Sequence, residues 1–306
     1  MSGTDRAFYR GRPSALRILG GQVVYQLRLL RRSPIAAFAT LVIPLMVLLA
    51  IGLLYANARV STRGDIRYVQ FLTPAMVVFA TVTACYMGVI SSTVLAREQG
   101  ILKRIRGTPL PAWAYLTGRI IAAGIVAGVS SLVVIGVGMA AYGFHMMWSS
   151  VPPALLVLTT AIFCFCSLGL AVTIVVPSAE SALPLAWGTM LPLCFISDVF
   201  QPIDGAPAWL RSVAAVFPVR RFADQLEALF NPVTGGTRLD GADLVMLVVW
   251  GAGAALFALI AFRWEPAGEH GGIFPALRAI ASLVRERITD LLGACAKRLS
   301  AKGRPL

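Results

Sequence analysis

Charged residues are scarce in this chain. Of its 306 residues, 13% are Asp, Glu, Lys or Arg, whereas about 25% is usual for a soluble domain. Hydrophobic residues make up 58%, above the roughly 45–50% of such domains. The composition therefore argues against a soluble globular protein.

Cysteine and histidine are also few, with five Cys and two His. Five Cys are too few, and odd in number, for a disulfide scaffold. Cys164 and Cys166 lie in an apolar run, where a role as small apolar filler is expected. The sequence has no Gly-x-Ser-x-Gly, no His-Glu-x-x-His and no Asp pair within an apolar run. A membrane enzyme would therefore lack an evident nucleophile or metal site.

Long runs without charge dominate the chain. Ser33 to Ala58 contains 26 uncharged residues, which as a helix exceed the ~30 Å hydrocarbon core of a bilayer. The run from Ile120 to Ala179 is 60 residues long and must fold back once, near Gly143 to Pro153. We therefore expect an all-α polytopic membrane protein with six transmembrane helices, at about residues 34–57, 69–95, 116–142, 153–176, 182–200 and 243–263.

The basic residues predict the orientation of these spans. With the N-terminus inside, the cytoplasmic segments hold 20 Lys and Arg and the outer segments hold seven, while acids divide seven and seven. Short basic loops stay on the cytoplasmic side. Both termini are therefore expected in the cytoplasm of a multi-pass protein of the inner (plasma) membrane, and nucleic acid is not expected as a partner.

Three segments follow from this division. Residues 1–33 form a cytoplasmic N-terminal segment with an amphipathic helix, residues 34–263 a six-span membrane domain, and residues 264–306 a basic amphipathic tail. An unstructured basic arm is the alternative for the first segment. The tail is expected to lie on membrane lipid of the inner leaflet, with contact to a partner protein as its alternative role.

The segment between the second and third spans is dense in charge. Ile101, Leu102 and Ile105 line one side of a short helix that Gly107 and Pro109 stop. A loop that is merely basic would explain the Arg and Lys residues, but it would not explain the helix-stopping Gly107 and Pro109 or the acidic Glu98. The pattern indicates a short cytoplasmic docking helix.

Two sequence blocks resemble a known family. The run Arg-Glu-x-Gly-x-Leu-x-Arg-x-x-x-Thr-Pro-Leu-Pro, from Arg97 to Pro111, is similar to the signature of type-2 ATP-binding-cassette exporter permeases, notably the daunorubicin-resistance-like transmembrane subunits. The block from Phe195 to Asp204 resembles the region after the fifth span of that family. One departure is Asp198, where the family usually has Gly.

The resemblance implies a partner and a mechanism. In that family the permease dimerises, as a homodimer or heterodimer, and its second loop packs on a separate ATPase subunit, which binds ATP and Mg. This chain has no Gly-x-x-x-x-Gly-Lys-Ser/Thr phosphate loop of its own, so no cofactor is expected in it. The residues expected to couple it to the ATPase are Arg97, Glu98, Gly100, Leu102, Arg104 and Ile105.

Four of these residues have a specific expected role. Glu98 is expected to make a charged or helix-capping contact, and Gly100 is expected to permit close backbone approach. Leu102 and Ile105 are expected to supply the apolar part of the interface.

The segment after the fifth span is too apolar for a free loop. Two short amphipathic helices separated by Pro218 are expected there, and the resemblance implies that they re-enter the outer leaflet. A soluble substrate-binding domain is the alternative, although about 45 residues is small for one. The residues singled out in this extracellular region are Asp198, Pro202, Pro207, Trp209 and Pro218.

The expected function is that of the permease subunit of an ATP-driven exporter of drugs, polyketides or lipids. A polysaccharide or glycolipid exporter permease is the nearest rival. An ion-coupled secondary drug antiporter is the other alternative, but only Asp198 and Glu180, at span ends, could serve it.

Overall fold

The computed structural model describes residues 15–32, 34–55, 58–60, 64–106, 112–202, 205–233 and 239–261. The predicted tail at 264–306 lies outside these residues, as does the start of the N-terminal segment. The prediction that the tail lies on lipid therefore stays a prediction.

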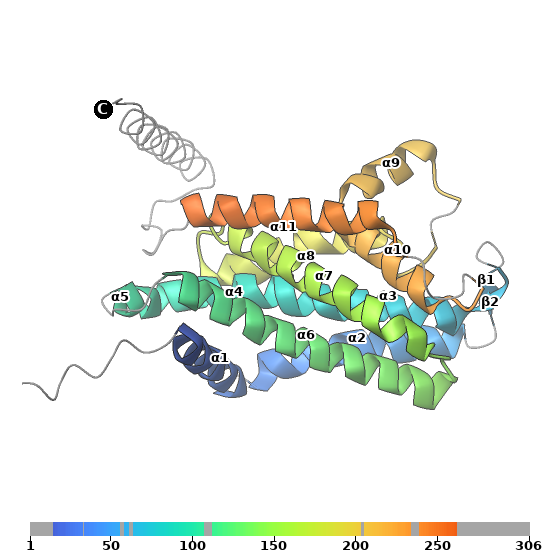
Figure 1. The fold of residues 1–306 in the computed structure, drawn as a ribbon, viewed down its shortest axis with the longest axis horizontal. Coiled ribbons are helices and arrows are strands. Elements are labelled where there is room, and N and C mark those ends of the chain that lie inside the picture. Colours follow the sequence, from blue (N-terminus) through green and yellow to red (C-terminus); the bar gives the residue numbers. More distant parts are fainter. Residues whose placement is uncertain are drawn as a thin grey trace, which may run out of the picture.

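The described chain is a bundle of helices that run side by side, which confirms the expected all-α membrane fold (Figure 1). The structure also has a short hairpin that was not expected from the sequence. Its two strands, β1 (Arg59–Val60) and β2 (Ile66–Arg67), have two residues each and pair antiparallel. The helices are α1 (Ala15–Arg32), α2 (Pro34–Leu54), α3 (Tyr68–Val82), η2 (Thr83–Met87), α4 (Gly88–Glu98), α5 (Ile101–Arg106), α6 (Ala112–Tyr142), η3 (Trp148–Ser150), α7 (Val151–Val172), α8 (Ala179–Phe195), α9 (Ala208–Val216), α10 (Pro218–Phe230) and α11 (Gly241–Ala261).

Four helical stretches among the described residues are long and apolar enough to cross a membrane. They are Tyr68–Glu98, Ala114–Tyr142, Trp148–Val172 and Gly241–Ile260. The first expected span contributes the shorter apolar stretch Thr40–Leu54, and the fifth is the 17-residue helix α8. Because α8 is about 26 Å long, shorter than the ~30 Å core, the count of six spans stays a proposal.

The second expected span is the centre of the bundle. Its helix is continuous from α3 through the π-helix η2 to α4. In the most apolar 18-residue stretch of this helix 83% of the residues are buried, against 28% in the corresponding stretch of α6 and 22% in that of α11. The exposed side chains of α6 and α11 are mostly apolar, such as Leu132 and Leu259. Such faces suit contact with lipid.

Glycine residues bring the helices close together. A Cβ on Gly138 of α6 would lie 2.7 Å from a side-chain atom of Thr73, and one on Gly169 of α7 would lie 2.9 Å from the Tyr86 carbonyl oxygen. Small residues at such crossings let helix backbones approach in membranes. Gly169 therefore seats α7 directly on the π-helix.

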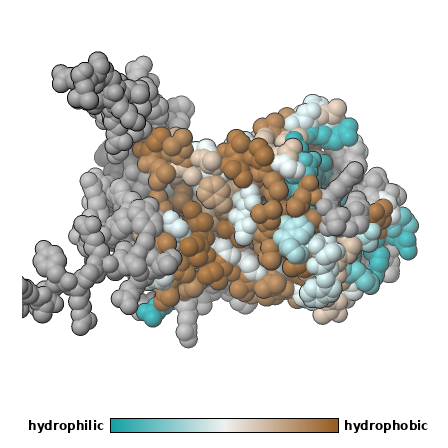
Figure 2. Space-filling view, in the orientation of Figure 1, coloured by the Kyte–Doolittle hydropathy of each residue, from teal (hydrophilic) through white to brown (hydrophobic). Residues whose placement is uncertain are grey.

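The two ends of the bundle differ. One end carries α1 and α5, and the other carries the hairpin, α9 and α10 (Figure 1). Figure 2 shows apolar residues over the middle of the visible face and hydrophilic residues gathered toward the α9 end. We call these the α5 end and the α9 end.

Candidate functional site

The corner between α4 and α5 is the sharpest feature of the α5 end. Helix α4 finishes with Glu98, and the backbone N–H of Gln99 donates to the Leu95 carbonyl at 3.0 Å. Gly100 then turns the chain with a φ of 67°, in the left-handed region that glycine adopts without a steric cost. Helix α5 starts at the next residue, so a short helix forms where the sequence predicts one; its docking role stays a prediction.

Arg97 fastens this corner to the end of α7. Its side chain is buried, and its guanidinium donates to the carbonyl oxygens of Thr173, at 3.0 Å, and Val176. Thr173 is the C-cap residue of α7, where the helix dipole is negative, and Val176 lies in the link from α7 to α8. Arg97 therefore caps α7 with positive charge.

Glu98 fastens the same corner to the start of α8. Its carboxylate oxygen Oε1 accepts a hydrogen bond from the backbone N–H of Ala179 at 2.6 Å. Ala179 is the first residue of α8, where the dipole is positive. Two neighbouring residues of opposite charge thus bind two helix ends of opposite polarity. Ser178 and Ser181 complete the start of α8 as a capping box.

The other expected coupling residues lie differently. Leu102 is fully buried in this chain's own core with Tyr115, so it anchors α5 to the bundle instead of offering an apolar surface. Nothing lies within 4 Å of a Cβ built on Gly100, so within this chain its positive φ, not a close approach, requires glycine. Arg104 is exposed, and Ile105 lies in α5 with its side chain outside the described part.

Asp198 lies at the α9 end, just after α8. Its φ of 59° explains why glycine is usual at this position in the family that the sequence resembles. The carboxylate is buried, and its Oδ2 pairs with Nη2 of Arg220 at 3.0 Å. Nε of Arg220 also pairs with Asp224, one turn on in α10, at 3.0 Å. Asp198 therefore joins the C-terminal end of α8 to α10.

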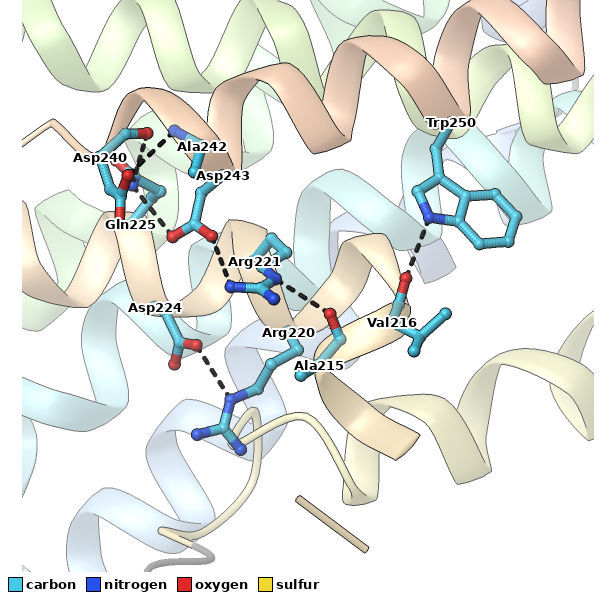
Figure 3. Close-up of polar contacts among 10 residues, drawn as sticks. All are labelled: Ala215, Val216, Arg220, Arg221, Asp224, Gln225, Asp240, Ala242, Asp243 and Trp250. Carbon is cyan, nitrogen blue, oxygen red and sulfur yellow. Dashed lines mark hydrogen bonds and ion pairs between the residues drawn. The ribbon is translucent and has the colours of Figure 1, made fainter. Parts of the chain in front are cut away.

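A second polar group joins α10 to its neighbours α9 and α11 (Figure 3). Arg221 pairs with Asp243 of α11 at 2.8 Å and donates to the Ala215 carbonyl of α9 at 2.9 Å. Gln225 donates to the second oxygen of Asp243 at 3.2 Å. Trp250 of α11 donates to the Val216 carbonyl at 2.9 Å. These contacts hold α9, α10 and α11 together as one unit.

The remaining residues singled out at the α9 end lie in this unit or shortly before it in the chain. Pro202 is half-buried, Pro207 precedes α9 as its N-cap, and Trp209 is 67% exposed. Pro218 is buried at the first position of α10, which suits proline because that residue's N–H has no helical partner. Two helices divided at Pro218 thus form where the sequence placed them.

Sequence reasoning did not find Arg220, Arg221 or Asp243. The spacing of Arg220 and Asp224 at i and i+4 is a signal that could have found the first pair. It also missed Gln70, a buried residue of α3 that donates to the carbonyls of His145, at 2.7 Å, and Phe230, at 3.1 Å. A lone Gln at the start of an apolar run carries no comparable signal.

The family model described as ABC-2 type transporter matches residues 23–230 of this chain. The probable doxorubicin resistance ABC transporter permease protein DrrC of Mycobacterium tuberculosis is 26% identical over 277 residues, covering 85% of this chain and 94% of the relative. The putative transport permease ycf38 of Cyanophora paradoxa is 22% identical over 214 residues, covering 66% and 70%.

The probable multidrug ABC transporter permease YbhR of Escherichia coli K12 is 24% identical over 168 residues, or 54% of this chain. The match covers 45% of that relative, so the chain spans less than half its length. The family match takes in α5, the corner at Arg97 and Glu98, and Asp198 with Arg220. With several helices apolar enough to span a bilayer, the chain belongs to the ABC-2 type transporter family, as a multi-pass membrane permease.

Proposed function

We propose that this chain is the membrane subunit of an ATP-driven exporter of amphiphilic or hydrophobic compounds, such as a drug, polyketide or lipid. It works with a separate ATP-binding-cassette ATPase, which binds the ATP and Mg, and with a second permease subunit. Six spans with both termini in the cytoplasm of the plasma membrane complete the proposal.

The observation that carries the proposal is the corner at the α5 end. A short helix with an exposed arginine, Arg104, stands on a turn whose two preceding residues bind the ends of α7 and α8. A force applied to α5 from outside the membrane would reach two other membrane helices directly. A docking surface for a motor subunit needs such a connection, because a loose loop would absorb the displacement.

The substrate class is inferred from the spans and from the relatives' names. The described spans carry no carboxylate between their first and last turns, so they offer no acid near the middle of the membrane for proton coupling. The buried Asp243, in the first turn of α11, pairs with Arg221. Asp198, at a span end, is held by Arg220. Relatives named for doxorubicin and multidrug resistance favour an apolar, amphiphilic cargo.

The test is purification of the tagged chain from its native membranes, followed by reconstitution with doxorubicin as the transport probe. We expect an ABC ATPase to co-purify, and we expect vanadate-sensitive ATP hydrolysis and ATP-dependent doxorubicin movement in proteoliposomes. Doxorubicin movement driven by a proton gradient without ATP would favour the antiporter. A complex that hydrolyses ATP but ignores doxorubicin would keep the ATPase partner and overturn the substrate class.

A further inference from the structure

Helix α8 is held to the bundle in an unusual way. Its buried side chains are Ala182, Ala186, Met190 and Cys194, which recur every fourth residue and so form one narrow ridge. Most of its other side chains are exposed or half-buried. A helix packed along one ridge of mostly small side chains has little apolar area to fix its position along its axis.

Directional polar contacts fix α8 instead, at three levels. At the α5 end, Ala179 N–H donates to Glu98 at 2.6 Å. Near the middle, the hydroxyls of Thr189 and Tyr86, the latter in the π-helix, lie 2.9 Å apart. Just beyond the α9 end of the helix, Asp198 pairs with Arg220 at 3.0 Å. The Asp198–Arg220 pair is buried and the Tyr86–Thr189 contact is partly buried, so these two are costly to leave unmade. The Glu98 contact is exposed, and it fixes the first residue of α8 by its direction.

The middle contact has a second effect. Pro184 and Pro192 lie inside α8, and each removes one backbone hydrogen bond from the helix. Thr189 lies between them, and its hydroxyl also donates to the Leu185 carbonyl at 2.9 Å. The contact with Tyr86 thus holds the weakened part of α8 in line with the central span.

We propose that α8 is the strut that carries movement of the α4–α5 corner to the unit of α9, α10 and α11, with Glu98 as the positioning residue at its inner end. Glu98 then acts inside this chain and not on the ATPase surface. The inference rests on the proposed function, since the movement is supplied by the ATPase bound at α5.

The test measures the outer end of α8 while nucleotide is changed at the other end of the molecule. A single Cys replaces Phe195, whose side chain is 49% exposed, in a chain whose five Cys are replaced by Ala. The permease–ATPase complex is placed in nanodiscs, and the rate of maleimide labelling is compared between the nucleotide-free and vanadate-trapped states. A Cys at Met139 of α6, 41% exposed and outside the unit of α9, α10 and α11, is the matched control.

We expect a several-fold change in labelling rate at position 195 on trapping. Glu98→Gln should keep the change, because the amide oxygen still accepts from the Ala179 N–H, whereas Glu98→Ala should abolish it with the ATPase still bound and trapped. Asp198→Asn, which tolerates the left-handed backbone, should also abolish it. Adding Glu98→Ala to Asp198→Asn should cause no further loss, because one linkage is already broken.

Two results would overturn the strut: position 195 responding to nucleotide as strongly in Glu98→Ala as in the parent, or no response in the parent although nucleotide is trapped. A response of equal size at position 139 would also overturn it, since the movement would then be global. Absence of any co-purified ATPase or trapped nucleotide would instead refute the proposed function, and the strut with it.

Discussion

At the scale of single residues, a few charged side chains hold the ends of the helices. Arg97 and Glu98 differ in sign and bind helix ends of opposite dipole. Asp198 and Arg220 form a buried pair at the other end. A buried pair is weak evidence for net stability, but removing one member strongly destabilises a protein.

Arg220→Met tests this pair. Burying Asp198 without its cation should lower the free energy of unfolding by about 3–5 kcal/mol, seen as a lower thermal midpoint of the purified permease in detergent. Arg211→Met, at an exposed position of α9, should change stability by about 0.5 kcal/mol or less. Asp198→Gly combined with Arg220→Met should recover part of the loss. Equal midpoints for the two single variants would show that the pair contributes nothing.

Gly100 separates two explanations for a glycine at the corner. Its φ of 67° predicts that Gly100→Ala costs about 1–2 kcal/mol and that Gly100→Asn costs less. Because a Cβ there meets nothing in this chain, Gly100→Asn should also bind the ATPase normally if geometry alone requires glycine. Normal folding with lost ATPase binding in Gly100→Asn would show that the partner approaches the backbone there.

At the scale of elements, the sequence predicted where the helices lie better than it predicted what they pack against. Runs without charge placed the long helices, and Pro218 placed the division between α9 and α10, because hydropathy and proline act locally. The π-helix η2 could not be foreseen, since the sequence of its residues is that of an ordinary apolar helix. Leu102 was expected at the interface with the ATPase, because the periodicity of a helix shows which side is apolar but not what that side packs against.

Gly169 provides a test of how α7 packs against η2. A Cβ 2.9 Å from the Tyr86 carbonyl oxygen cannot be relieved by a side-chain rotation, so Gly169→Ala should destabilise the permease by about 1–3 kcal/mol. Gly136→Ala, where nothing lies within 4 Å, is the matched control and should be neutral or slightly stabilising. Thermal unfolding in detergent measures both. The same midpoint for both variants would mean that α7 does not need this close approach.

At the scale of the whole molecule, the described helices form a bundle with two distinct ends. Arg97 and Arg104 belong to the α5 end, whereas Arg220 and Arg221 lie with acidic partners at the α9 end. The orientation stays a prediction from the charge of the loops. The contacts that hold each end together could not be predicted, because contacts such as Glu98 with Ala179 join residues 81 positions apart.

The orientation has a direct test by thiol labelling in intact cells. Single Cys residues at Gly235 and Ser300, each in a background without Cys, are exposed to an impermeant reagent. The partition of 20 and seven basic residues predicts labelling at position 235 alone. Labelling at position 300 alone would reverse the topology.

The central claim is that a separate ATPase drives this permease through α5, and one comparison tests it most directly. Arg104→Glu reverses an exposed charge on α5, and Arg211→Glu reverses an exposed charge on α9 at the opposite end. Vanadate-sensitive ATP hydrolysis and the amount of co-purified ATPase are measured for both variants after reconstitution. We expect Arg104→Glu to lose at least about tenfold in both, the effect of roughly 1.4 kcal/mol of lost binding, while Arg211→Glu matches the parent. Full ATPase binding and activity in Arg104→Glu, or an equal loss in Arg211→Glu, would contradict the account.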